Sequence, residues 1–128
     1  MRKIIISGIS MAILCFTSMG VQAENGQYAE GVAQLKNQKY EDAFLTLQPL
    51  VEQGDPRSVF QLAMMYHGGL EVEFNEAKAV ELYKVAAEQG VVEAQEYLAA
   101  GYREGWWGLP MDYEKYRYWM DKAVQTHL

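Results

Sequence analysis

Cysteine is almost missing from this sequence. The one copy, Cys15, lies in an apolar segment near the N-terminus. A domain that follows this segment has neither a disulfide nor a thiol nucleophile, and it must be stabilised by packing alone. Histidine is nearly as rare, since His67 and His127 are the two copies and share no ligand spacing with a pair of carboxylates. We therefore expect no metal site and no cofactor.

The motifs of common enzyme classes are missing as well. The sequence has no Ser-x-x-Lys, no Gly-x-Ser-x-Gly and no glycine-rich phosphate-binding loop. Positive charge is also scarce, with 11 basic against 17 acidic residues. An acidic chain is poorly suited to binding nucleic acid or an anionic membrane surface. These absences argue against an enzyme and against a polyanion-binding protein.

The apolar N-terminal segment has the layout of a secretory signal peptide. Positive charges at residues 2–3 precede an apolar stretch over residues 4–21, and Val21-Gln22-Ala23 forms a small-x-small cleavage site. A transmembrane anchor is disfavoured because polar residues and glycines dilute the stretch and no Lys/Arg cluster follows it. We expect residues 1–23 to be removed, leaving a domain of residues 24–128 in the periplasm or outside the cell. Without the two basic residues of this segment, the net charge becomes 9 − 17 = −8 with His neutral.

The rest of the chain is an internal repeat. Glu52-Gln53-Gly54 recurs as Glu88-Gln89-Gly90, a spacing of 36 residues. The same spacing relates Ala43 to Ala79, Leu62 to Leu98, Ala63 to Ala99 and Tyr66 to Tyr102. Beyond Tyr102 the register slips by one residue, within the segment that contains Trp106 and Trp107. This pattern divides the domain into three repeats, at about 27–54, 55–90 and 91–127.

Each repeat has the pattern of two helices. The apolar residues between Ala79 and Ala87 are spaced i, i+3, i+4, i+7 and i+8, and the same stripe recurs from Tyr116 to Val124. Asp55, Asn75 and Asp112 are predicted N-caps, and Gly54 and Gly90 are predicted left-handed helix ends. The predicted helices are 26–36, 40–53, 56–67, 75–89, 92–103 and 112–126. The fold class is therefore all-α, a short right-handed α-solenoid of about three helix-turn-helix repeats.

One segment carries a family resemblance. The residues Leu62-Ala63-Met64-Met65-Tyr66, then Gly69, Lys78-Ala79 and Ala86-Ala87-Glu88-Gln89-Gly90, resemble the Sel-one-like repeat (SLR) family, which is related to the tetratricopeptide repeat. The resemblance implies an exported bacterial protein whose stacked helix pairs bind another protein. Glu71 departs from the pattern, because the family usually has a loop glycine there. The disulfides of many exported members are also missing.

The tetratricopeptide pattern, projected onto this sequence, predicts a binding groove on the first helix of each pair. Its candidate residues are Arg57, Phe60, Met64 and His67 in one repeat and Glu93, Glu96, Ala100, Arg103 and Glu104 in the next. An apolar patch beside charged residues would suit a peptide or a protein protrusion. The alternative is that Phe60 and Met64 pack against the adjacent repeat, and the sequence leaves both interpretations open.

Trp106 and Trp107 form the second candidate feature. Adjacent tryptophans in a loop cannot both point the same way, so at least one is a candidate for exposure. The favoured interpretation is that they fold back onto Tyr113, Tyr116 and Trp119 and close the end of the core. The alternatives are a hot spot for a protein partner, in which tryptophan is enriched, and stacking against a sugar ring.

The leading functional hypothesis is an exported adaptor or scaffold in the cell envelope that binds a protein or peptide as a monomer. The alternative is an exported inhibitor or immunity protein that binds a specific toxin or enzyme. An enzyme acting on cell-wall material is a distant third. The monomer is expected because the last helix has a mostly polar second face, as a terminal capping helix requires.

Export is directly testable. Mass spectrometry of the protein isolated from its natural source should show a chain that begins at Glu24, because the signal peptidase cleaves after Ala23. Recovery of the full-length chain from the cytoplasm would contradict the prediction.

Overall fold

The structure, a computed structural model, describes residues 23–128, so nearly all of the predicted signal peptide lies outside the described residues. The regular elements in this part of the chain are all helices. They are a first helix over residues 23–36, then α2 (Tyr40–Glu52), α3 (Pro56–Gly68), α4 (Glu76–Glu88), α5 (Val92–Glu104) and α6 (Tyr113–His127). From residue 36 onward each helix boundary falls within one residue of its predicted position.

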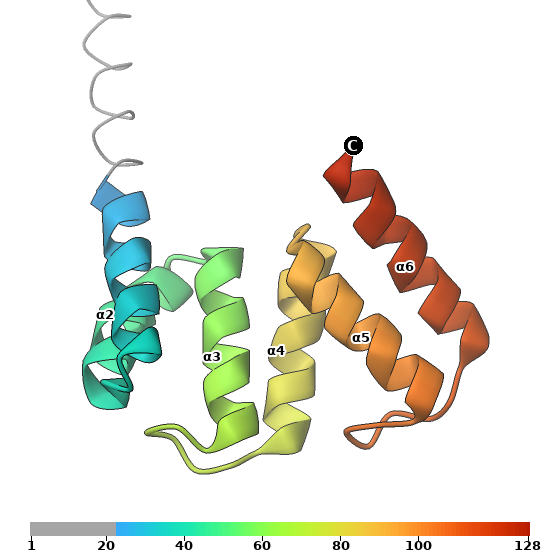
Figure 1. Ribbon diagram of the computed structural model, residues 1–128, viewed down its shortest axis with the longest axis horizontal. Helices are drawn as coiled ribbons and strands as arrows, with labels where there is room; N and C mark the ends of the chain where they lie inside the picture. The colour runs from blue at the N-terminus through green and yellow to red at the C-terminus, as the bar shows by residue number, and fades with distance from the viewer. Residues whose placement is uncertain (1–22) are drawn as a thin grey trace, which may run out of the picture.

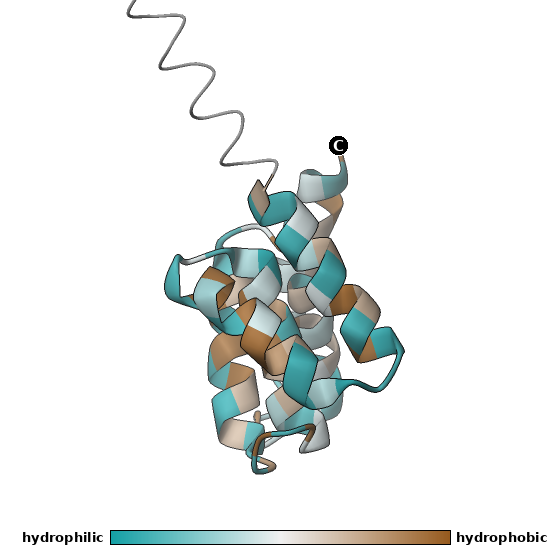
Figure 2. Cartoon of the chain, turned by 90° about the vertical axis from the view of Figure 1, so that its left-hand side faces the viewer, coloured by the Kyte–Doolittle hydropathy of each residue, from teal (hydrophilic) through white to brown (hydrophobic). Residues whose placement is uncertain are grey.

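The helices form an all-α solenoid of hairpins, as predicted. Consecutive helices from α2 to α6 pack against each other, and Figure 1 shows α3 to α6 following one another across the molecule. Hydrophobic and hydrophilic residues alternate along each helix in Figure 2, as expected for helices that bury one face. Each hairpin therefore leaves an apolar stripe that its neighbour in the array covers.

Alanine is the most frequent buried hydrophobic residue in the described part of the chain. Ala43, Ala63, Ala86, Ala94 and Ala99 are completely buried. A methyl side chain lets two helix backbones approach closely and costs little side-chain entropy on folding. Larger core residues then fill the space between the alanine contacts: Leu47, Leu50, Val59, Met65, Tyr83, Leu98 and Trp119.

Two predicted N-caps are confirmed. The side chain of Asn75 accepts a hydrogen bond from the backbone N–H of Lys78 at 2.9 Å. Asp112 Oδ1 accepts from two backbone N–H groups at the start of α6, at 3.0 and 3.1 Å. Both side chains satisfy donors that have no partner within their own helix.

Asp55 does not cap α3 in the predicted way, because its side chain accepts no backbone hydrogen bond. Its Oδ2 accepts from the hydroxyl of Ser58 at 2.7 Å, and its Oδ1 pairs with Nε of Arg57 at 3.2 Å. Two side-chain donors of the first turn thus occupy the carboxylate in place of the backbone N–H groups. The helix still begins at Pro56, whose ring fixes a helical φ.

Left-handed residues separate the helices. Gly54 and Gly90 have φ of 84° and 92°, as predicted from their place after the Glu-Gln pair. Glu71, which stands where the SLR pattern has glycine, also takes a left-handed φ of 63°. The loop between α3 and α4 therefore keeps its conformation with a residue that adopts it less readily.

The first helix packs closely on α2 at Gly31. A Cβ added at this buried glycine would lie 2.5 Å from Cδ2 of Leu47, a side chain that is 1% exposed. Gln27 reinforces the contact, because its Nε2 donates to the carbonyl of Thr46 at 2.9 Å. The absence of a side chain at residue 31 is what permits this approach.

This contact predicts opposite outcomes for two glycines of one helix. Gly31→Ala should lower the free energy of unfolding by about 1–3 kcal/mol, the usual cost of overpacking. Gly26→Ala is the matched control, because no atom lies within 4 Å of its added Cβ; it should leave stability unchanged or raise it by up to about 1 kcal/mol. Urea titrations of the two purified variants test this. Equal stability of Gly31→Ala and the wild type would refute the close packing.

Candidate binding surface

Three pockets open on the surface lined by the first helix, α3 and α5, which we call the groove face. The first, about 320 Å³ in volume, lies between Tyr28 of the first helix, the start of α3 and the start of α5. The second, about 380 Å³, lies between the first helix and α3 beside Met64. The third, about 330 Å³, lies on α5 beside Trp106 and Trp107. The first helix, α3 and α5 are the first helices of the three hairpins. The sequence predicts a binding groove on these helices.

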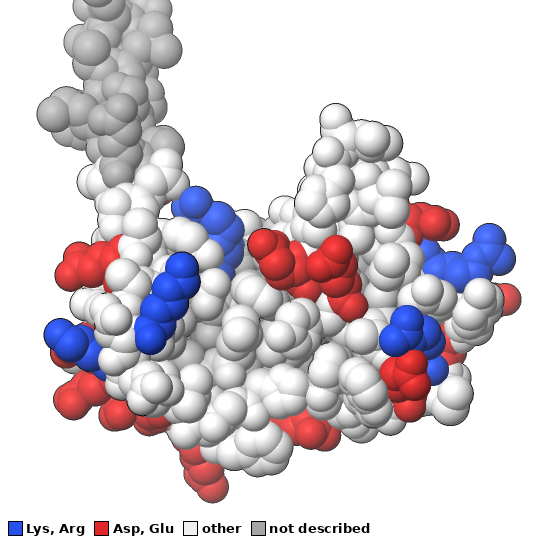
Figure 3. Space-filling view, viewed as in Figure 1, with Lys and Arg blue, Asp and Glu red and all other residues white. Residues whose placement is uncertain are grey.

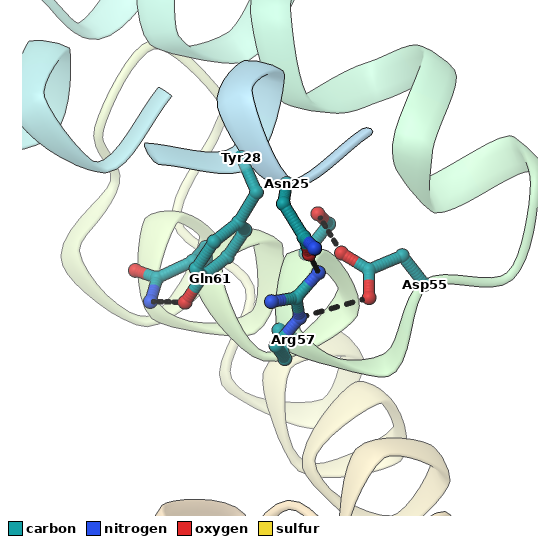
Figure 4. A network of polar contacts seen from close by, with 6 residues as sticks. Asn25, Tyr28, Asp55, Arg57 and Gln61 are labelled. Carbon is teal, nitrogen blue, oxygen red and sulfur yellow. Dashed lines mark hydrogen bonds and ion pairs between the residues drawn. The ribbon is translucent and has the colours of Figure 1, made fainter. Parts of the chain in front are cut away.

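Arg57, a candidate residue, ties the first helix to α3 (Figure 4). Its Nη2 donates to Oδ1 of Asn25 at 2.9 Å, and its guanidinium lies 4.5 Å from the centroid of the Tyr28 ring. Gln61 adds a second link, because its Nε2 donates to the hydroxyl of Tyr28 at 3.2 Å. Arg57 lines the first pocket, and two of its nitrogens, Nε and Nη2, donate within the chain.

Phe60 belongs to the core. It is 7% exposed, and its ring lies 5.7 Å from Tyr83 and 5.8 Å from Tyr97. Of the two interpretations that the sequence left open, the burial of Phe60 favours core packing, although Phe60 also lines the first pocket and its role in binding stays a prediction. Met64, one turn later on α3, is 37% exposed and lines the second pocket. It remains a candidate binding residue.

A column of aromatic rings leads from the core to the third pocket. Tyr83 stacks on Tyr97 with centroids 5.2 Å apart, and Tyr97 stacks on Trp107 at 5.8 Å. His67 packs its ring edge-to-face with Trp107 at 5.2 Å, and its Nδ1 lies 3.2 Å from the hydroxyl of Tyr83. Burial, with a smaller contribution from Tyr97, raises the pKa of Tyr83. His67 thus packs against Trp107, which lines the third pocket.

The direction of Trp107 differs from the favoured prediction. Its aromatic neighbours are residues of α3, α4 and α5 together with Trp106, and Tyr113, Tyr116 and Trp119 are not among them. The reason is the backbone of the loop: Trp107 takes a left-handed φ of 59°, and Gly108 follows with 71°. This turn brings the indole onto α5.

Gly101 makes room for that indole. A Cβ at Gly101 would lie 3.0 Å from Cε3 of Trp107 and 2.8 Å from Cδ1 of Leu109. Sequence reasoning missed both Gly101 and Tyr97, although a signal exists. The two residues are four positions apart on one face of α5, and a glycine inside a helix often marks a close contact.

The third pocket combines indole faces with a carboxylate. Its lining residues are Glu96, Tyr97, Ala100, Trp106 and Trp107, and Trp106 is 51% exposed. Glu93, another candidate acid of α5, lines the first pocket. Acidic side chains gather at the centre of the molecule in Figure 3, between the first helix and α6.

Arg103 is engaged elsewhere. Its Nε donates to Oε1 of Glu104 at 2.6 Å, and its guanidinium lies 5.8 Å from the ring centroid of Tyr116 on α6. The Glu104 carboxylate raises the pKa of Arg103. The structure therefore brings Glu96, Trp106 and Trp107 together at one pocket and leaves Arg103 outside its lining.

Phe60 is more deeply buried than Met64, so their alanine variants should differ in stability. Phe60→Ala should lower the free energy of unfolding by about 3–5 kcal/mol, because it leaves a cavity beside Tyr83. Met64→Ala should lower it by about 1 kcal/mol, since the side chain is partly exposed. Chemical denaturation followed by circular dichroism measures both. A Phe60→Ala variant as stable as Met64→Ala would show that Phe60 is not core.

No family model matches the chain, and no curated protein is significantly similar to it. Several solved structures are similar to it, and two of them are described here. A Sel1 repeat protein from Oxalobacter formigenes is 30% identical, with a TM-score of 0.59 over 65% of this chain and 63% of that chain. A protective antigen of uropathogenic Escherichia coli with an SLR fold is 28% identical, with a TM-score of 0.69 over 82% of this chain and 23% of that chain.

This chain thus spans less than two thirds of either solved chain. Within that span the likeness includes sequence as well as helix arrangement. It agrees with the 36-residue spacing, with the left-handed glycines after each Glu-Gln pair and with the stacked hairpins. In fold and in sequence, the chain is similar to Sel1-like repeat (SLR) proteins.

Proposed function

We propose that this protein is an exported adaptor of the cell envelope whose groove face holds a segment of another protein. The SLR fold supports a role in protein–protein interaction in general. The observation that carries the proposal is the half-exposed Trp106 beside a rigid aromatic column, on the same face as two further pockets.

Trp106 has the properties of an interface anchor. Tryptophan is enriched among the few interface residues that provide most of the binding energy, and such residues lie in pockets that a partner can cover. Trp106 stands at the rim of a pocket whose inner wall, Trp107 on Tyr97, is already ordered by the core. A partner would therefore lose little free energy in ordering this surface.

Met64 extends the same surface toward the first helix. The second pocket beside it is lined mainly by aliphatic carbon, from Val32, Leu35, Met65 and Leu70. A flexible thioether at such a site adapts to different partner side chains. A bound segment that covers Met64 and Trp106 would run across α3 and α5.

The signal-peptide pattern of residues 1–23 supports export, and the acidic balance of the rest of the chain supports a protein partner over a polyanion. Within residues 23–128, no helix is long and apolar enough to cross a membrane. The same residues contain no group of three His, Cys, Asp or Glu side chains placed to hold a metal ion.

A pull-down from envelope extract, with the purified protein as bait, should capture a partner. Trp106→Ala should then weaken the affinity for that partner by about 5- to 150-fold, the effect of losing an anchor of about 1–3 kcal/mol. Isothermal titration calorimetry measures the affinity, and a thermal melt checks that the variant stays folded.

Tyr118→Ala is the control, because Tyr118 on α6 is 53% exposed, slightly more than Trp106, and lines none of the three pockets. It should leave the affinity unchanged. A partner that loses affinity with Tyr118→Ala and keeps it with Trp106→Ala would place the binding surface on α6 and contradict the proposal.

A further inference from the structure

Four tyrosine rings in the described part of the chain each have a cation of the chain near their face. The pairs are Arg57 over Tyr28, Arg103 over Tyr116, Lys115 over Tyr102 and Lys122 over Tyr118, at 4.5 to 5.8 Å from the ring centroid. None of these cations lies over an indole of the third pocket. Indole attracts cations more strongly than phenol does, so the half-exposed indole of Trp106 is a strong cation acceptor that none of these four cations occupies.

The two indoles of that pocket form an angled pair. Their centroids are 5.8 Å apart and their planes meet at 56°. Trp107 is held by its stack on Tyr97 and by the edge of the His67 ring. Trp106, half exposed, forms the outer side. A flat group can therefore lie against one indole while the other flanks it.

A carboxylate completes the pocket. Glu96 lines it and is exposed, and among residues 23–128 neither Glu96 nor Glu93 forms an ion pair with a Lys or Arg side chain. An apolar group that covered this carboxylate would remove its hydrating water and provide no hydrogen bond or ion pair in exchange, which costs free energy. A cation placed there gains a charge-assisted hydrogen bond in addition to the contact with the rings.

We propose that the pocket formed by Glu96, Tyr97, Ala100, Trp106 and Trp107 binds an arginine side chain from a basic segment of the partner protein. Arginine fits better than lysine, because its planar guanidinium stacks on an aromatic face while its N–H groups reach a carboxylate. The volume of about 330 Å³ is at the small end for ligand sites, which suits one side chain. This inference rests on the proposed function and specifies the partner's chemistry.

The acidity of the chain supports a basic partner. The domain that follows the predicted signal peptide has a net charge of −8, and acidic side chains gather at the centre of the molecule in Figure 3. Opposite charge on the partner would raise the rate of association and orient the encounter. Arg57 is the one cation on the lining of the first pocket, and Asp55 pairs with it.

The test uses two capped peptides, Gly-Arg-Gly-Arg-Gly and the same sequence with citrulline in place of arginine. Citrulline keeps the size and planarity of the side chain and removes its charge. Tryptophan fluorescence of the purified wild-type protein should change on titration with the arginine peptide. The citrulline peptide should bind about tenfold more weakly, because it forms no cation–π contact and no charge-assisted hydrogen bond. Added salt should weaken the binding of the arginine peptide and leave the binding of the citrulline peptide unchanged.

Two variants locate the binding. Glu96→Gln and Trp106→Ala should each lower the affinity for the arginine peptide by about 3- to 10-fold. This is the effect expected for the loss of one exposed cation–π or ionic contact. Glu114→Gln and Tyr118→Ala, at exposed positions of α6, are the matched controls and should have no effect. Glu96→Gln changes one exposed atom, so a loss of folding does not complicate its result.

Equal affinity of the two peptides, or an arginine affinity that Glu96→Gln does not change, would overturn the inference. So would binding of an N-acetylglucosamine trimer at the same tryptophans in place of the arginine peptide, which would identify a sugar site. A captured partner whose affinity is insensitive to Glu96→Gln would refute the arginine contact and leave the adaptor role intact. If the pull-down captures no protein while the arginine peptide still binds, the adaptor role fails instead.

Discussion

The burial of the Tyr83 ring is the interaction on which both the core and the groove face depend. Tyr83 is 1% exposed and contacts Phe60 of its own hairpin and Tyr97 of the next. Aromatic pairs of this kind contribute about 0.5–1.5 kcal/mol each beyond the burial of area. Because Tyr97 also carries Trp107, the packing between two hairpins fixes the inner wall of a surface pocket. The pocket is thus an extension of the core and is ordered before any partner arrives.

The helices were predictable because their signals are local and repeated. Stripes such as Ala79 to Ala87 and caps such as Asn75 and Asp112 depend on residues three or four positions apart. The structure confirms these elements within about one residue from position 36 onward. The repeat adds a second, independent signal, since Gly54 and Gly90 occupy equivalent left-handed positions.

The site was only partly predictable, because its geometry depends on contacts between hairpins. The tetratricopeptide pattern placed Phe60 and Met64 on one helix face, but burial separates them: the rings of Tyr83 and Tyr97 cover Phe60. The direction of Trp107 depends on a left-handed backbone that bulky residues rarely adopt. Such a conformation persists when the surrounding contacts stabilise it. Here these are the stack of Trp107 on Tyr97 and its close packing at Gly101.

The chain contains its own example of the contact that we propose for the partner. Arg57 lies over the Tyr28 ring while its Nε pairs with Asp55, so one guanidinium uses an aromatic face and a carboxylate together. The third pocket likewise has an aromatic side chain, Trp106, and a carboxylate, Glu96, on its lining. An arginine that arrives on another molecule also loses translational and rotational freedom, which Arg57 does not. One such contact therefore binds a free peptide only weakly, and most of the affinity for a whole partner must come from further contacts along the groove face, such as those at Met64. The arginine would then determine which partner binds and in which direction it lies.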